Sequence, residues 1–336
     1  MRVTGVQTCA LPICAWEHPA DRAALAALKQ VPGLNEVIKF LIGLTGEKSL
    51  RFLFLSSSVR VSEKQFPEMH NMLEEACRVL DAPEVPELYV TQNPVLNAGA
   101  IGVKKPFIVV NSSILKTLDS KETLGVVAHE LAHILSGHVL YKTLLWLLVN
   151  LSILFLQIPV SAVILQGIIA ALREWDRKSE LSSDRAGLLV TQEPAVAYTT
   201  LMKLAGGGDI EQMNIDEFFA QAEEYDRGGD LLDGVTKLFN LIGQSHPFPV
   251  LRLREIHHWA EDGEYGAILD GTYARRDQEE QADIRKEFDE ASKAYQEDFD
   301  RSEDPLAKAM SNVSKGFENV RKDAEKIFND IFSRKE

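Results

Sequence analysis

Two histidines and a glutamate near the middle of the chain have the spacing of a metal site that hydrolyses bonds. They stand in the segment His129-Glu130-Leu131-Ala132-His133. Residues four apart on an α-helix lie on one face, so the two imidazoles can meet at one zinc ion. Zinc lowers the pKa of a bound water to about 7, and Glu130 stands where it can move a proton from that water to a leaving amine. The motif therefore predicts hydrolysis of peptide bonds with Glu130 as general base.

A catalytic zinc site needs a third protein ligand and an open fourth position. One known arrangement, that of the metzincins, places glycine at position 135 and histidine at position 139. Leu135 and Val139 occupy these positions, which excludes that arrangement. His138 is one residue out of register and is interpreted as a polar residue at the helix end.

A later pair of acidic residues offers the missing ligand. Glu180 and Asp184 stand four apart in a helical pattern, so they share one helix face. Glu180 is predicted to bind the zinc, while Asp184 accepts the free N–H of a ligating histidine. Such a bond fixes the ring tautomer and makes the bound nitrogen more basic.

Three segments in this order, HELAHILSGH, SELSSDRAGL and SHPFPVLR, resemble the gluzincin family that includes HtpX and the type I CAAX prenyl protease. The likeness extends from about residue 87 to residue 252. It implies a metalloendopeptidase with one Zn²⁺ per chain and a role in membrane protein quality control. It also implies His129, His133 and Glu180 as ligands, with Asp184 as the partner of His129.

The same resemblance assigns further residues. His246 would stabilise the oxyanion, and Arg252 would support the site. Asn97-Ala98 would lie on an edge strand that pairs with an extended polypeptide substrate, a mode that tolerates many side chains. The alternative is a non-catalytic, zinc-stabilised adaptor or chaperone-like protein. Glu130 distinguishes the two functions, because a purely structural zinc site has no use for a base.

The elements that must position these residues are mostly helical. Helical spacing of apolar residues covers residues 21–55 and 66–80, whereas residues 87–92, 98–103 and 107–110 predict three short strands. Asp119, followed three residues later by Glu122, predicts the start of the helix that carries His129 to His138. The expected fold is therefore mainly α with a small β-sheet (α+β).

Residues 143–172 contain no charged residue and are divided by Pro159. Each arm reaches about 22 Å as a helix, which is short of the about 30 Å core of a bilayer. The chain must also return, because His133 and Glu180 flank the segment. We expect a helical hairpin that enters or lies on a membrane, or one buried in the protein or an oligomer. The resemblance favours the membrane, and Lys142 and Arg173 favour an active site facing the cytoplasm.

The remaining features concern the domain boundaries, the net charge and the cysteines. Residues 1–14 look like a non-native leader, residues 15–272 are predicted as the peptidase domain, and residues 273–336 as a charged helical or disordered tail. A net charge of −14 argues against nucleic acid as a partner. Three cysteines without metal spacing suggest a reducing compartment, and nothing in the sequence sets the oligomeric state.

Overall fold

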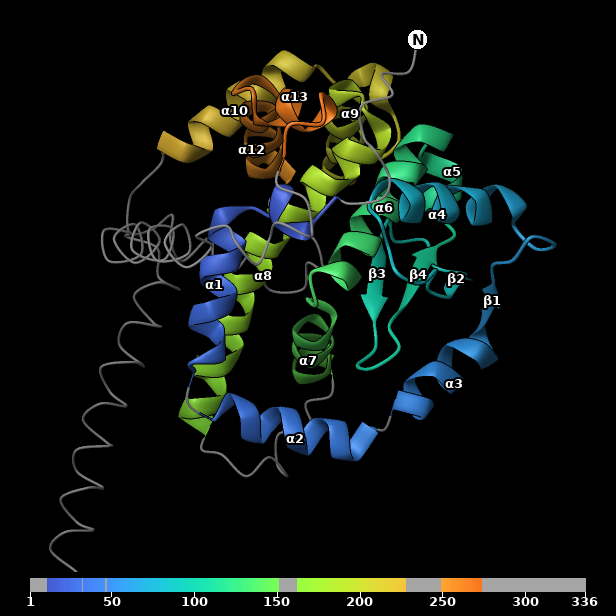
Figure 1. Ribbon diagram of the computed structural model, residues 1–336, viewed down its shortest axis with the longest axis vertical. Helices are drawn as coiled ribbons and strands as arrows, with labels where there is room; N and C mark the ends of the chain where they lie inside the picture. The colour runs from blue at the N-terminus through green and yellow to red at the C-terminus, as the bar shows by residue number, and fades with distance from the viewer. Residues whose placement is uncertain (1–10, 32, 46, 151–161, 228–248, 274–336) are drawn as a thin grey trace, which may run out of the picture.

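The computed structural model describes residues 11–31, 33–45, 47–150, 162–227 and 249–273, and it confirms a mainly helical fold with one small sheet (Figure 1). The α-helices are α1 (Pro19–Lys29), α2 (Leu34–Thr45), α3 (Glu47–Ser57), α4 (Pro67–Val79), α5 (Ile114–Thr117), α6 (Ser120–Leu135), α7 (Val139–Asn150), α8 (Ala162–Thr191), α9 (Pro194–Gly206), α10 (Ile215–Arg227), α12 (Pro249–Glu261) and α13 (Glu264–Leu269). Short 3₁₀ turns cover Ile13–Ala15 and Ile210–Gln212.

The sheet has four strands in the order β1-β2-β4-β3, one more than the sequence predicts. Its strands are β1 (Ser58–Arg60), β2 (Leu88–Thr91), β3 (Ala98–Ile101) and β4 (Phe107–Asn111). β2 and β4 are parallel, and the other two pairs are antiparallel. The unpredicted strand β1 follows α3 directly and is only three residues long, too short for an alternating pattern to show.

The start of α6 has the predicted capping box. The Asp119 side chain accepts hydrogen bonds from the backbone N–H groups of Lys121 and Glu122, and the Glu122 carboxylate accepts one from the backbone N–H of Asp119. Glu122 also accepts hydrogen bonds from Thr199 and Lys203 on α9. The cap therefore fixes both the first turn of α6 and its contact with α9.

We expect Asp119→Ala to lower the free energy of unfolding by about 1 kcal/mol, because two backbone N–H groups at the start of α6 lose their acceptor. Urea denaturation measures this change. Ser120→Ala is the matched control: Ser120 is also exposed, its hydroxyl bonds Glu68 rather than the helix backbone, and its loss should stay below about 0.5 kcal/mol. Equal losses in the two variants would contradict the role of the cap.

α6 and α8 pass each other at two glycines. A Cβ added at Gly187 would lie 3.1 Å from the carbonyl oxygen of Gly125, so the two backbones are almost in contact. His129 lies one turn after Gly125, and Asp184 lies one turn before Gly187. The close crossing therefore brings these two side chains together, with His129 Nδ1 3.1 Å from Asp184 Oδ1.

The predicted continuation of α6 to His138 is wrong, because the helix ends at Leu135. Gly137 adopts a left-handed conformation, with φ at 70°, which suits glycine. The backbone N–H of His138 bonds the carbonyl of His133, and that of Gly137 bonds the carbonyl of Ile134. These two bonds form a Schellman motif. The chain leaves it as α7, at 99° to α6.

Each described arm of the apolar segment buries one side in the core of the protein. Buried residues of α7 and α8 form one core with residues of α1 and α2: Leu144, Leu147, Leu148, Leu165, Ile168, Leu172, Leu28 and Leu34. The predicted turn at Pro159 lies outside the described residues. Within the described part of the chain, no single helix is long and apolar enough to span a membrane, and only the bent pair α6–α7 meets that test by length and composition.

The N-terminal segment also contributes to the core. Leu11 is fully buried among the residues that pack α4, α6 and the sheet, and Ile13 packs against the same cluster. Leu11 and Ile13 therefore pack against the core, and the non-native origin of residues 1–14 stays a prediction. Residues 1–10 and 274–336 lie outside the described residues.

Candidate active site

Three buried side chains from α6 and α8 converge on one point. His129 Nε2 lies 3.3 Å from Glu180 Oε2, and His133 Nε2 lies 3.3 Å from Glu180 Oε1. One ligand atom from each of the three lies within 4.8 Å of the others. Atoms bound tetrahedrally to one zinc at about 2.1 Å are about 3.4 Å apart. The two-nitrogen, one-oxygen set therefore fits a catalytic zinc in chemistry and in spacing.

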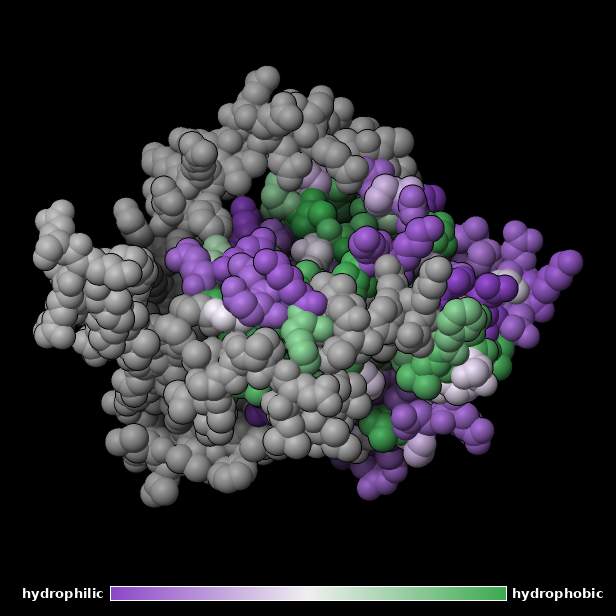
Figure 2. Space-filling model, turned by 90° about the horizontal axis from the view of Figure 1, so that it is seen from below, coloured by the Kyte–Doolittle hydropathy of each residue, from purple (hydrophilic) through white to green (hydrophobic). Residues whose placement is uncertain are grey.

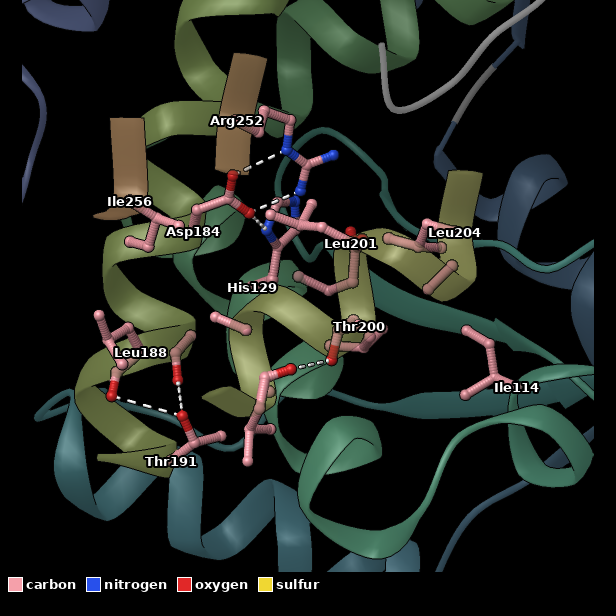
Figure 3. A pocket seen from close by; sticks show the side chains of 17 residues that line it. Ile114, His129, Asp184, Leu188, Thr191, Thr200, Leu201, Leu204, Arg252 and Ile256 are labelled. Carbon is pink, nitrogen blue, oxygen red and sulfur yellow. Dashed lines mark hydrogen bonds and ion pairs between the residues drawn. The ribbon is translucent and has the colours of Figure 1, made fainter. Parts of the chain in front are cut away.

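The outer nitrogen of His129 faces the predicted carboxylate. Asp184 Oδ1 lies 3.1 Å from His129 Nδ1. Arg252, buried on α12, donates to Asp184 Oδ2 from Nε at 2.7 Å and to Oδ1 from Nη2 at 2.5 Å (Figure 3). Its Nη1 lies 3.1 Å from Glu180 Oε2. Arg252 therefore holds both Glu180 and Asp184 in place.

The charges of this cluster shift its pKa values. Burial alone would lower the pKa of His129, but Glu180 and Asp184 outweigh burial and raise it to about 9. Burial would raise the pKa of Asp184, yet Arg252 and His129 hold it below its usual value. The pKa of His133 is well below its usual value because of burial and the nearby Lys142 cation. The two histidines therefore differ in protonation at neutral pH.

Lys142, which precedes the apolar segment in the sequence, is paired with carboxylates inside the protein, and the predicted orientation of the site toward the cytoplasm stays a prediction. It lies on the first turn of α7 and points toward α8, where it donates to Asp176 Oδ1 at 2.6 Å and to Glu180 Oε1 at 2.7 Å. These carboxylates offset burial and raise its pKa above the usual value. The position at the end of an uncharged run indicated a boundary, and the partners on α8 could not be read from the sequence.

Glu130 is buried and lines a cavity beside the three converging side chains. Figure 3 shows this cavity between α6, α8, α9 and α12. Its wall is mostly apolar and includes Ile114, Val126, Leu188, Leu201, Leu204 and Ile256. Ala98, on the last strand of the sheet, also lines it, whereas Asn97 does not. The cavity thus joins the candidate base to a sheet edge and an apolar wall.

Two further histidines were considered from the sequence, His246 for the oxyanion and His138 for the helix end. His246 lies outside the described residues, so its predicted role stays a prediction. His138 follows the end of α6, as interpreted, but it is fully buried, and its Nδ1 lies 3.0 Å from Nδ1 of His133. Gly137 was the sequence signal for this contact, because a glycine at that position ends a helix and folds the next residue back.

The comparison with known families agrees with this geometry. Residues 63–260, more than half of the chain, match Peptidase family M48. The chain belongs to peptidase family M48. The matched segment includes every described residue of the converging cluster, the Asp184–Arg252 pair and the cavity. The chain is therefore a peptidase, and the predicted likeness to HtpX-type metallopeptidases is confirmed.

Curated M48 relatives differ in how much of the chain they match. Plastoglobule-localized metallopeptidase 48, chloroplastic, of Arabidopsis thaliana is 38% identical over 260 residues, which are 76% of this chain and 74% of that protein. Protease HtpX homolog 2 of Methanosarcina mazei is 25% identical over 178 residues, 46% of this chain and 60% of the relative. Protease HtpX homolog of Ralstonia nicotianae is 24% identical over 250 residues, which are 64% of this chain and 82% of that protein. No solved structure matches the chain.

Proposed function

We propose that this M48 peptidase is a zinc-dependent endopeptidase in which His129, His133 and Glu180 hold the metal. The convergence of these three side chains beside Glu130 is the observation that carries the proposal. Zinc would supply a Lewis acid that brings the pKa of a water molecule to about 7. A closed structural zinc site would instead have four protein ligands, and the described residues offer three at this point.

The other residues of the site then have distinct tasks. Glu130 accepts a proton from the attacking water and donates it to the leaving amine. Asp184 accepts the Nδ1–H of His129, which directs Nε2 toward the metal position. Arg252 fixes the Asp184 carboxylate through two hydrogen bonds. From the family resemblance, His246 stabilises the oxyanion.

A reversible metal requirement tests the proposal. The purified full chain should cleave labelled casein, lose that cleavage in a chelator and recover it when zinc but not magnesium is returned. Cleavage that persists in the chelator would exclude zinc catalysis. If the chain binds one zinc but cleaves neither casein nor a peptide library, the non-catalytic adaptor becomes the better assignment.

Zinc binding should release between about one and two protons per chain at pH 7, one from His129 and a fraction from the metal-bound water. In the absence of metal, the raised pKa of about 9 leaves His129 protonated at pH 7, whereas His133 is already neutral. Zinc must displace the His129 proton, so its affinity should rise about tenfold per pH unit up to about pH 9. Calorimetry at pH 7 in buffers with different ionisation enthalpies counts the protons. A count of zero at pH 7 would contradict this assignment of charge.

The cavity supports a substrate that is an extended polypeptide with an apolar side chain next to the cleaved bond. β3 ends the sheet, and Ala98 on β3 faces the same cavity as Glu130. A peptide paired along β3 would therefore pass the base and place a side chain against the apolar wall. Backbone pairing explains tolerance of sequence, and the wall adds a preference at one position.

We expect kcat/KM to rise along a peptide series with alanine, valine and leucine at that position, by about 4-fold per buried CH₂ group. Leu204→Ala should move the optimum to a larger side chain, because Leu204 is a half-buried residue of the wall. Leu115→Ala is the matched control on α5, since Leu115 is exposed and does not line the cavity. A flat series, or an equal change in both variants, would contradict this preference.

We also propose that the end of the molecule bearing α3 contacts a membrane surface, with membrane proteins as substrates. Phe52 and Leu53 are 65% and 53% exposed, and Trp146 on α7 is 41% exposed. Figure 2 shows apolar side chains gathered over α3 on the face seen from below. The protein should float with lipid vesicles, and a double variant with Phe52→Ser and Leu53→Ser should not. Val85→Ser, which removes another exposed apolar side chain, should float as the parent does.

A further inference from the structure

On the side of His133 that faces away from Glu180, two further polar side chains are in contact one after the other. His133 Nδ1 is 3.0 Å from Nδ1 of His138, and Nε2 of His138 is 3.0 Å from Asp21 Oδ2. All three side chains have no exposed surface. Their order is therefore carboxylate, imidazole, imidazole, with the last imidazole also facing Glu180.

The fold holds His138 in this position without freedom to turn away. The Schellman motif at the end of α6 stacks its last residue, His138, on the residue five positions earlier, His133. The edge of the His138 ring meets Trp175 of α8, with centroids 5.4 Å apart and planes at 78°. The ring is thus fixed between the helix end and a buried tryptophan.

Asp21 reaches the cluster from α1, more than one hundred residues away in the sequence. The Ser182 hydroxyl on α8 donates to Asp21 Oδ2 at 2.5 Å and accepts the backbone N–H of His18 at 2.9 Å. These two bonds join the N-cap and the first turn of α1 to α8 at Ser182, which stands between Glu180 and Asp184 in the sequence. Burial of a carboxylate is unfavourable unless it is hydrogen-bonded, so the Ser182 and His138 partners stabilise it.

The donor and acceptor pattern along these three side chains has a consistent solution. A histidine that binds metal through Nε2 carries its proton on Nδ1. The Nδ1–H of His133 then faces the Nδ1 lone pair of His138, and the Nε2–H of His138 faces the Asp21 carboxylate. Ser183 Oγ is a second neighbour of His133 Nδ1, at 3.0 Å.

We propose that Asp21 and His138 are positioning residues that orient His133 for metal binding, as Asp184 orients His129. This inference rests on the proposed function, since it assigns His133 as a zinc ligand. Both histidines would then be held by carboxylates, one directly and the other through an intervening imidazole. Asp21 and His138 touch neither the metal position nor the cavity, so they act through His133.

Zinc affinity of the full chain, measured by competition with a chelating dye, tests the proposal. His138→Leu removes the acceptor and should weaken zinc binding by about 10–100-fold. His138→Asn returns an oxygen near the place of Nδ1 and should recover most of that affinity. Asp21→Asn should weaken binding less than His138→Leu, because the amide keeps the shape and the contact with Ser182. In His138→Leu and Asp21→Asn, kcat should fall even with zinc occupancy restored, while KM for a peptide stays unchanged.

Two controls separate orientation from packing. Trp175→Phe disturbs the same buried ring contact without touching the hydrogen bonds, so it should lower thermal stability but not zinc affinity. Ser183→Ala should change zinc affinity less than His138→Leu. The proposal is overturned if His138→Leu and His138→Asn bind zinc equally, or if Ser183→Ala has the larger effect. It is also overturned if a second zinc binds at the neighbouring group of Glu17, Asp21 and His138.

The proposed function can fail separately. If the parent chain binds no zinc, the zinc-peptidase proposal itself is wrong. If the parent binds one zinc and every variant binds it as tightly, only the positioning inference is wrong.

Discussion

Replacing Glu130 by glutamine is expected to lower kcat/KM for peptide hydrolysis by about 10²–10⁴-fold, the contribution of a positioned general base. The amide has the same shape as the carboxylate and cannot accept the proton from water. Glu130 lines the cavity and is not one of the three residues that offer ligand atoms, so the zinc content should remain one per chain. Steady-state cleavage of a fluorescent peptide gives the rate, and elemental analysis gives the zinc.

Glu122→Gln is the control for Glu130→Gln. Glu122 is also buried on α6, but it bonds Thr199 and Lys203 on α9 and does not line the cavity. Its loss should reduce stability and leave kcat/KM of the folded protein within about 2-fold, because its partners are remote from the reacting atoms. Glu130→Gln with more than a tenth of the parent rate would exclude Glu130 as the base.

Glu180→Gln should weaken zinc binding by more than about 100-fold, since removal of an outer partner of a ligand already costs about 10–100-fold. The neutral amide keeps the volume of the carboxylate but loses the charge that faces both histidines. Cleavage should fall in proportion to zinc occupancy at a given zinc concentration. Competition with a chelating dye measures the affinity, and circular dichroism checks that the variant is folded.

Asp176→Asn is the matched control for Glu180→Gln. Asp176 and Glu180 lie one turn apart on α8, and both accept a hydrogen bond from Lys142. Only Glu180 also faces His129 and His133. Asp176→Asn therefore removes a similar buried charge and should retain zinc affinity within about 10-fold. Equal losses would mean that Lys142, and not the metal, is the main partner of Glu180.

Much of the candidate site could be predicted from local sequence. The spacing of His129 and His133 defines one helix face, and the spacing of Glu180 and Asp184 defines another, so each pair needs only helical periodicity. The capping box at Asp119 is equally local. The three predicted strands are short β-type runs separated by Asn93-Pro94 and by Lys104-Lys105-Pro106.

Other features depend on contacts that no local pattern encodes. Asp21 reads as an ordinary polar residue near the start of a helix, because its partners His138 and Ser182 are far along the chain. From the sequence Lys142 is only the residue before an apolar run, although its side chain on α7 bonds Glu180 on α8. The end of α6 at Leu135 was readable from Gly137, but the apolar residues that follow continued the helical pattern and concealed the break.

The length of α8 gives the molecule a mechanical property. This continuous helix holds Leu165 in the apolar core at one end and Glu180 at the site, about 22 Å apart along its axis. A rotation of α8 about its near-contact with α6 at Gly187 would have its pivot about 10 Å from Glu180. A tilt of about 5° around this pivot moves the Glu180 carboxylate by about 1 Å, a displacement that changes an enzymatic rate by about 10²-fold. A force that displaces the apolar end of α8 would therefore change kcat.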